Sequence, residues 1–383
     1  MPPVNSTVTL SGFWQPRINV KSLYYGSGCV EQHLLSTLPT PSSKAFIITG
    51  TSLATKTPLV RQLETLLGNH HAGTISSIRQ HGPIADVERA VETVLSRGDI
   101  DTIVSLGGGS PIDTAKVISL RIKESQGTFL THLTIPTTLS AAECTAGGGY
   151  TKPDGMKVGF RAPEMGVSAI FYDPQYARYT PKDLWLSTGM RAMDHAVECM
   201  YHPHATEVPW KALSLWAAGE LFECLPKARD LHPHDESVTI RLMLAAYASS
   251  GLKGENLKGG MGLSHSLGHA LGSPYNIPHG ITSCMTLGKV VQLKAHESLE
   301  NAKQITRLLP ATGGRPTDDI LRDAIEVGDR IIALVSSLLP NVGTLSARGV
   351  SKDETPLITQ RALGGVREGP LYDQVEKLVQ TLF

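Results

Sequence analysis

The sequence predicts an α/β domain at the N-terminus followed by an all-α domain at the C-terminus. Short apolar segments alternate with amphipathic segments over the first 180 residues, and only long helical patterns follow. Alternation of strands and helices is typical of a parallel sheet. A chain of 383 residues is also long for one domain. We therefore expect two domains, 1–180 and 181–383.

The elements of the first domain follow from apolar spacing and from glycines at the ends of segments. The run at 44–50 is apolar and ends in glycine, which indicates a buried strand. The segment 57–68 has helical spacing and stops at Gly68. The same arguments predict a helix at 84–98, a strand that runs into a glycine turn at 101–110, a helix at 111–122, a strand and loop at 132–143, and a last strand at 167–174.

The second domain is expected to consist of helices. Its first helix is marked by Thr180 as N-cap and Pro181 in the first turn. The predicted helical segments are 180–202, 208–230, 237–253 and 317–339.

Composition excludes several classes of function. Lys+Arg and Asp+Glu are both 35, so the charge balance favours neither nucleic acid nor an anionic membrane. No segment resembles a secretory signal or a membrane span. The five cysteines are widely scattered, as reduced thiols are in a cytoplasmic protein. We expect a cytoplasmic protein whose partner is a small molecule.

The clearest local signal is the glycine turn "SLGGGSPIDTAK" at 105–116. Gly107, Gly108 and Gly109 follow a buried strand and let the backbone approach an anion, and Ser110 adds a hydroxyl donor. The N–H groups of the following helix favour phosphate. This predicts a dinucleotide-binding domain. The alternative is a turn that needs glycine only for its geometry.

The end of the strand at 44–50 bears on the choice of dinucleotide. An NAD site often carries Asp or Glu at such a strand end to hold the ribose 2′-OH. Gly50, Thr51 and Ser52 stand there instead, and none of them repels a 2′-phosphate. The sequence therefore favours NADP over NAD, unless this loop turns away from the cofactor.

A group of histidines marks the candidate active site. His265 and His269 share one helix face at a spacing of four residues. Gly272, Ser273 and Pro274 are expected to end that helix, and "PHG" to turn the chain back through His279. His195 lies earlier, four residues after Arg191. Such clustering favours a functional site over a structural role.

These motifs together resemble the iron-containing alcohol dehydrogenase superfamily, in particular its maleylacetate reductase-like branch. "GGGSPIDTAK", "IPTT" followed by Glu143, "YDP", "HAVE" and "GLSHSLGHALG…PHG" occur in the family's order. The resemblance implies a dehydroquinate synthase-like architecture, a cleft between two domains, a homodimer, and hydride exchange between a nicotinamide cofactor and a carbonyl or alcohol. It also implies cofactor-binding roles, which fall on Gly107 to Ser110, Asp113, Thr137, Thr138 and Lys157.

One position departs from the family's pattern. Metal-dependent members carry an Asp and a His four residues apart, then two more His, and the corresponding histidines are His195, His265 and His279. Arg191 stands at the Asp position. A guanidinium has no lone pair and repels a divalent cation, although three neutral histidines can hold zinc.

Two acidic residues, Asp194 and Glu198, lie near Arg191 on the same predicted helix. We expect Asp194 to point about 100° away from His195 and to stay out of a shared site. The alternative is that Arg191 has only a structural role, as the partner of Asp194 or Glu198 in a salt bridge.

We therefore expect a metal-independent, NAD(P)H-dependent reductase of a small carbonyl or oxo-acid. His195, His265, His269 and His279 are the candidate proton donors, and Arg191 would supply the charge that a metal otherwise brings. Two alternatives stay open at this point: a non-redox lyase, isomerase or cyclase on the same fold, and a metal-dependent alcohol dehydrogenase with a three-histidine site.

Overall fold

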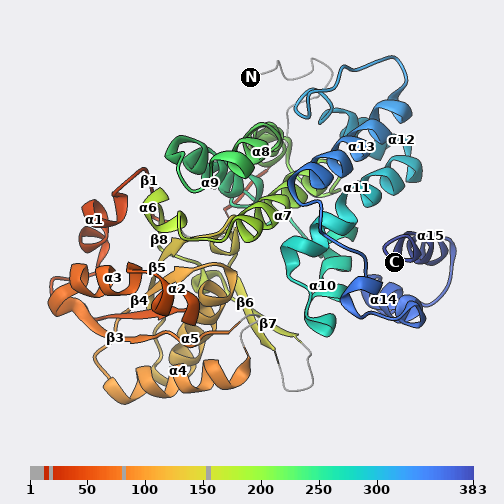
Figure 1. Ribbon diagram of the computed structural model, residues 1–383. Coiled ribbons are helices and arrows are strands. Elements are labelled where there is room, and N and C mark those ends of the chain that lie inside the picture. Colours follow the sequence, from red (N-terminus) through yellow and green to blue (C-terminus); the bar gives the residue numbers. More distant parts are fainter. Residues whose placement is uncertain (1–12, 17–19, 80–82, 152–156) are drawn as a thin grey trace. The chain divides into compact units, whose positions relative to one another are not determined.

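The computed structural model describes residues 13–16, 20–79, 83–151 and 157–383 (Figure 1). Contacts between residues divide the chain into two compact units. The α/β unit consists of the described residues between 20 and 181, together with Leu231–Met243. A helical unit contains 13–16, Lys182–Asp230 and Leu244–Phe383. Relative to the expected boundary at residue 180, the two units thus exchange two short segments.

The α/β unit is built on a six-stranded parallel sheet with the strand order β1-β8-β5-β4-β2-β3. Two further strands form a separate antiparallel hairpin, β6-β7. The strands are β1 (Ser22–Tyr25), β2 (Ala45–Thr49), β3 (His71–Ile75), β4 (Thr102–Gly107), β5 (Thr131–Pro136), β6 (Gly147–Thr151), β7 (Lys157–Arg161) and β8 (Ala169–Tyr172).

Helices cover both faces of this sheet. On one face α1 and α3 pack through residues such as Val30 and Leu63, and on the other α4 and α5 pack through residues such as Val87 and Ile118. Strands buried on both faces read as continuous apolar runs, which is why the sequence identifies them. The helices of this unit are α1 (Cys29–His33), α2 (Thr51–Lys56), α3 (Leu59–Leu67), α4 (Ile84–Arg97), α5 (Gly109–Gln126) and α6 (Pro174–Ala177).

The strand order places a topological switch between β2 and β4. The chain continues from β2 to β3 on one side, whereas it continues from β4 to β5 on the other. In open parallel sheets, ligands bind at the carboxyl ends of the strands beside such a switch. Gly50 follows β2 and Gly108 follows β4, so both predicted cofactor segments lie at this place.

The helical unit contains no strand among the residues that the structure describes for it. The fold class predicted from the sequence is confirmed. The remaining helices of the chain are α7 (Lys182–Met200), α8 (Ala212–Leu231), α9 (Glu236–Ser250), α10 (Leu263–Tyr275), α11 (His279–Glu297), α12 (Leu299–Thr306), α13 (Ile320–Leu338), α14 (Thr355–Ala362) and α15 (Pro370–Gln380).

Three local predictions were wrong. His279 does not lie in a return loop, because it starts the long helix α11. Thr180 is not the N-cap of α7, because the helix begins at Lys182 and Pro181 lies between them; the Thr180 hydroxyl donates to the Thr137 carbonyl at 2.5 Å. Pro274 also lies inside α10, which continues to Tyr275.

The packing of α11 on α7 positions the candidate site. A Cβ atom on Gly280, in the first turn of α11, would lie 2.6 Å from the Ser187 carbonyl carbon. Only glycine allows this approach, which brings the first turns of α11 against the middle of α7.

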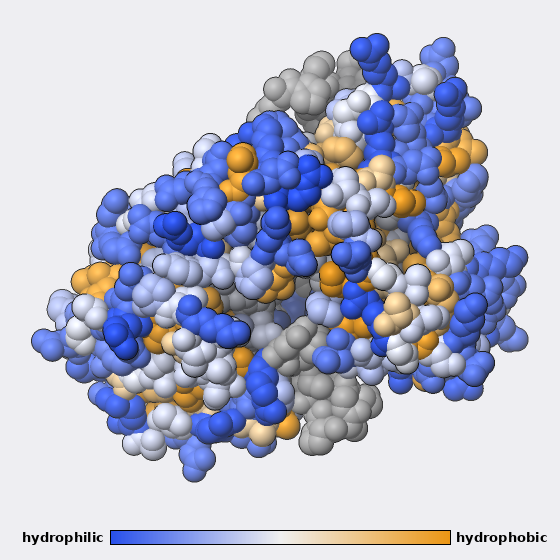
Figure 2. Space-filling view, in the orientation of Figure 1, coloured by the Kyte–Doolittle hydropathy of each residue, from blue (hydrophilic) through white to orange (hydrophobic). Residues whose placement is uncertain are grey.

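In the face shown in Figure 2, apolar residues lie in separate patches among hydrophilic ones. None of the helices in the described part of the chain is long and apolar enough to cross a membrane.

We predict that His132 makes folding sensitive to acid. His132 on β5 is buried, its Nε2 lies 2.7 Å from the Ser105 hydroxyl, and burial lowers its pKa to about 3. Between pH 6.5 and 3 the unfolded chain binds a proton that the folded chain excludes, so stability falls as pH falls, by about 1.4 kcal/mol per pH unit.

The measurement is the free energy of unfolding across that pH range for the wild type and for His132→Asn. The variant should show a shallower slope whatever its absolute stability. His296→Gln, which changes an exposed histidine, serves as the control. Equal slopes for wild type and His132→Asn would contradict the prediction.

Candidate functional site

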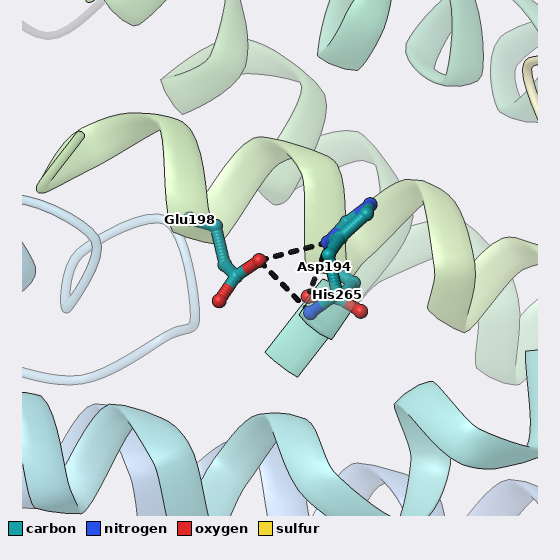
Figure 3. Close-up of side chains that lie close together, drawn as sticks. All are labelled: Asp194, Glu198 and His265. Carbon is teal, nitrogen blue, oxygen red and sulfur yellow. Dashed lines mark hydrogen bonds and ion pairs between the residues drawn. The ribbon is translucent and has the colours of Figure 1, made fainter. Parts of the chain in front are cut away.

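The candidate site is centred on the middle of helix α7. Arg191, Asp194, His195 and Glu198 are all buried there. Figure 3 shows the Asp194 and Glu198 side chains extending from α7 toward His265 on α10. Residues four apart share a helix face, so Arg191 pairs with His195 along one line and Asp194 pairs with Glu198 along the next.

Glu198 anchors the start of α10. Its carboxylate accepts hydrogen bonds from the backbone N–H groups of Ser264 at 2.7 Å and His265 at 3.2 Å. These are N–H groups of the first turn, which have no partner within their own helix. A Cβ atom on Gly262, the N-cap residue, would lie 2.5 Å from the Glu198 carboxyl carbon. Glu198 therefore performs the capping that a side chain at position 262 would otherwise provide.

Asp194 is held by three donors. Its Oδ2 accepts from the Ser283 hydroxyl at 2.6 Å, the Ser264 hydroxyl at 3.1 Å and Arg191 Nη1 at 3.3 Å. Its Oδ1 lies 3.3 Å from His265 Nδ1. The expectation that Asp194 stays out of a shared site is wrong, because α10 brings His265 within reach of both Asp194 and His195.

Arg191 forms a buried salt bridge with Asp194, one of the two pairings that the sequence offered as a purely structural role for this arginine. Its Nη1 donates to Asp194 and, at 3.2 Å, to the Ser283 hydroxyl. Burial lowers the pKa of Arg191 and the Asp194 charge opposes this, and a guanidinium keeps its proton at neutral pH. Nε and Nη2 donate to no residue in the described part of the chain, so the salt bridge uses one corner of the guanidinium.

Space for the guanidinium comes from a glycine on α10. A Cβ atom on Gly268 would lie 3.3 Å from Arg191 Nη1 and 3.0 Å from the Thr282 hydroxyl. Any larger residue at 268 would press on the arginine.

His265 has one ring nitrogen turned inward and one turned outward. Nδ1 lies 2.8 Å from a Glu198 oxygen, whereas Nε2 is buried without a hydrogen-bond partner. The described partners of Glu198 are all donors: two backbone N–H groups, the Tyr201 hydroxyl and His265 Nδ1. We therefore place the proton of neutral His265 on Nδ1, which leaves a lone pair on Nε2.

His195 lies against His265, with 4.7 Å between the ring centroids, and its Nδ1 is buried without a hydrogen-bond partner. Burial lowers the pKa of both imidazoles well below the ordinary value, and the charges of Lys253 and Arg191 add to this. Both rings are therefore neutral at pH 7.

The other two predicted histidines form a second pair. The rings of His269 and His279 meet edge to face with centroids 5.5 Å apart. A Cβ atom on Gly272 would lie 2.7 Å from His279 Cε1, so this glycine lets the ring pack on α10. The charge on His269 also contributes to the lowered pKa of His265, which connects the two pairs electrostatically.

The donor set does not fit a divalent metal well. Among the described residues, the group of three or more His, Cys, Asp or Glu side chains whose ligand atoms lie within 4.8 Å of one another is Asp194, Glu198 and His265. Its carboxylates are already bound to N–H groups, hydroxyls and Arg191. The predicted metal trio of His195, His265 and His279 does not meet that distance, and a fixed cation stands beside two of its members.

The predicted cofactor residues lie together at the carboxyl end of the sheet. The Thr137 N–H donates to the Gly107 carbonyl at 2.9 Å, and a Cβ atom on Gly108 would lie 2.9 Å from Thr138 Cγ2. No side chain caps α5 at Gly108, so the N–H groups of its first turn, which include Ser110, face the switch point.

Two predicted residues have other outcomes. Asp113 lies 3.4 Å from the Nζ of Lys116, which is fully buried and also donates to the carbonyls of Ala142 and Gly147. Lys157 begins β7, and its side chain lies outside the described residues. Lys116 therefore fixes the loop that follows β5, a role that a surface-like lysine in a helical pattern did not suggest.

Sequence reasoning missed most of the residues that hold the site in place. Ser264 and Ser283 carry no signal of their own, because isolated serines are common on helices. Lys253, whose charge acts on both His195 and His265, lies in a loop and matches no motif. Glu198 stood in the "HAVE" motif, but its partner became visible only with the position of α10.

Models of one protein family match most of this chain. A model described as iron-containing alcohol dehydrogenase matches residues 21–174, and the C-terminal model of the Fe-containing alcohol dehydrogenase family matches residues 185–382. A maleylacetate reductase from Rhizobium sp. is 29% identical over 266 residues, which cover 70% of this chain and 71% of the relative. Maleylacetate reductase 2 from Cupriavidus pinatubonensis is 31% identical over 247 residues, covering 64% and 65%.

The fold has close counterparts among solved structures. Maleylacetate reductase from Agrobacterium tumefaciens superposes with a TM-score of 0.79 at 23% identity and covers 97% of this chain and 99% of its own. This likeness concerns the fold.

We predict that Gly262→Ala destabilises the helical unit. The added methyl would meet the Glu198 carboxyl group and push it away from the N–H groups of α10, and such overpacking costs about 1–3 kcal/mol. Gly260→Ala is the matched control, because a Cβ atom there meets nothing within 4 Å. Denaturant unfolding should separate the two variants, and equal stabilities would contradict the capping role of Glu198.

Proposed function

We propose that this chain, which belongs to the maleylacetate reductase-like branch of the iron-containing alcohol dehydrogenase family, reduces a small carbonyl or oxo-acid without a metal. Membership of this family makes the chain an oxidoreductase that uses NAD(P)H. The observation that carries this proposal is the place of Arg191. Its charge is held beside His195 and His265, and most of its donors remain available to a substrate.

The α/β unit supplies the cofactor site in this proposal. Gly107 to Ser110 would hold the pyrophosphate at the N-terminus of α5, where the end of the helix favours negative charge. Gly50, Thr51 and Ser52 would lie at the adenosine ribose, and the lack of a carboxylate there favours NADPH. Thr137 and Thr138 complete the set. When bound, the nicotinamide supplies the hydride.

Arg191 would stabilise negative charge on the substrate. Asp194 and Ser283 fix Nη1, so the guanidinium cannot swing away when a substrate arrives. Nε and Nη2 can then donate to the developing oxyanion of the carbonyl, or to a substrate carboxylate in a bidentate contact. A preorganised charge of this kind acts on the reacting group without reorganisation during the reaction.

His265 and His195 would handle the proton. The lone pair on His265 Nε2 would take up a proton from solvent and pass it to the reduced substrate oxygen, while Asp194 and Glu198 hold Nδ1. The two carboxylates would stabilise the imidazolium that forms whenever Nε2 carries a proton, as a carboxylate does behind a catalytic histidine. His195 stacks on this ring and can hydrogen-bond to the same oxygen. His269 and His279 are proposed to line the site next to them.

Metal independence is the finer part of this proposal. A divalent ion at His195 and His265 would meet the Arg191 charge, and the carboxylates that could offset it are committed to protein donors. Arg191 therefore takes the role of the positive charge. The homodimer and the cytoplasmic location expected from the sequence stay predictions.

We predict that Arg191→Ala lowers kcat/KM for an oxo-acid by about 100-fold or more, the usual cost of losing an oxyanion donor. The dissociation constant for NADPH should stay within about twofold. Arg307→Ala is the control, because it removes a partly buried arginine from its ion pair with Glu207. Unchanged kinetics in Arg191→Ala, with folding verified by thermal unfolding, would contradict the role of this residue.

A further inference from the structure

Two arginines surround one buried carboxylate beside the end of β3. Arg79 lies in the loop after β3 and binds Asp86, in the first turn of α4, through Nε and Nη2 at 3.1 Å each. The Arg79 backbone N–H also donates to Asp86, at 3.2 Å. Arg89 donates to the same carboxylate from Nη2 at 2.8 Å.

This cluster carries a net positive charge. Asp86 is 1% exposed and is surrounded by two guanidinium groups, so one positive charge is not compensated within the cluster. The Arg79 side chain is 63% exposed. Its Nη1 donates to no residue that the structure describes, so the side chain is both fixed by Asp86 and open to an anion from solvent.

The backbone before Arg79 touches the end of β2. The Ile78 N–H donates to the Thr49 carbonyl at 3.3 Å. A Cβ atom on Gly50 would lie 3.3 Å from the Ile78 carbonyl oxygen, so glycine at position 50 lets the two strand ends come together. Arg79 is therefore next in the chain to a residue that contacts the Gly50 turn.

We propose that Arg79 binds the 2′-phosphate of NADP(H) and is the residue that selects NADPH over NADH. The inference rests on the proposed function, which assigns Gly50, Thr51 and Ser52 to the adenosine ribose. A guanidinium fixed through one edge presents its remaining N–H groups to phosphate oxygens in a defined direction. Arg89 supplies the second charge that keeps Asp86 from cancelling this attraction.

The geometry also explains why a neutral turn stands at the end of β2. A carboxylate there would attract Arg79 to itself and repel the phosphate. Ser52 is exposed and can donate from its hydroxyl, so the turn adds hydrogen bonds without adding negative charge. The combination of a neutral turn on β2 and an arginine after β3 fits a phosphorylated ribose and offers nothing specific to an unphosphorylated one.

The test is a titration of purified protein with NADPH and with NADH, followed by calorimetry, for the wild type, Arg79→Ala, Arg79→Lys and Arg89→Ala. Arg79→Ala should weaken the binding of NADPH by about tenfold or more, the usual cost of losing a charged hydrogen bond. The dissociation constant for NADH should change by less than about twofold. Arg79→Lys should keep part of the NADPH affinity, because the charge stays and the fork is lost.

Arg89→Ala is the comparison variant, since it removes an arginine of similar exposure, 56% against 63%, from the same carboxylate. It removes the second charge but leaves the Arg79 side chain in place, so NADPH affinity should fall by less than in Arg79→Ala. The Arg89→Ala variant should retain a clear preference for NADPH. An unchanged NADPH affinity in Arg79→Ala, or an equal loss of both dinucleotides, would overturn the inference while leaving the proposed function standing. A wild-type chain that binds neither dinucleotide would overturn both.

Discussion

Two carboxylates buried in helix α7 determine how the helical site is built. Asp194 and Glu198 are fully shielded from solvent, and an ionised group in such a place is costly unless donors surround it. Burial accordingly raises the pKa of both, and Arg191 and the N–H groups of α10 oppose that shift. The positions of Arg191, Ser283, Ser264 and the start of α10 all follow from the need to satisfy these two groups.

The same requirement sets the chemistry of the histidines. Because Asp194 and Glu198 both lie on the Nδ1 side of His265, only Nε2 is left for another partner. Burial lowers the pKa of the His195 and His265 rings, and the Arg191 charge, held nearby by Asp194, adds to this shift. A divalent ion bound at these histidines would lie beside the fixed charge of Arg191, which is the reason that we propose a metal-independent reaction.

Much of the fold could be read from the sequence, and the exceptions have physical reasons. Doubly buried strands such as β2 and β4 are continuous apolar runs with glycine at their ends. The edge strand β1 is partly exposed. The other edge strand, β3, contains Gly73, where a Cβ atom would lie 2.8 Å from the Phe46 ring. Neither has the apolar run that marks a buried strand. Helix α11 was missed because its start, "PHG", has the composition of a turn.

The candidate site was predictable in its members and not in its contacts. The four-residue spacing of Arg191 and His195 fixes their shared face, and the sequence gives this directly. The contact of Asp194 with His265 depends on where α10 lies, and that depends on Glu198, Gly262 and Gly280. Helical spacing describes one helix at a time, so it placed Asp194 outside a site that a second helix brings to it.

The central proposal is that Arg191 acts in place of a metal ion, and the metal content of the purified protein tests this directly. Purified protein would be stripped with a chelator, incubated with Zn²⁺ or Fe²⁺, dialysed, and analysed for metal and for NADPH-dependent reduction of oxo-acids. We expect no stoichiometric metal and the same activity before and after stripping. One tightly bound ion per chain, with activity lost on stripping and restored by that ion, would contradict the account.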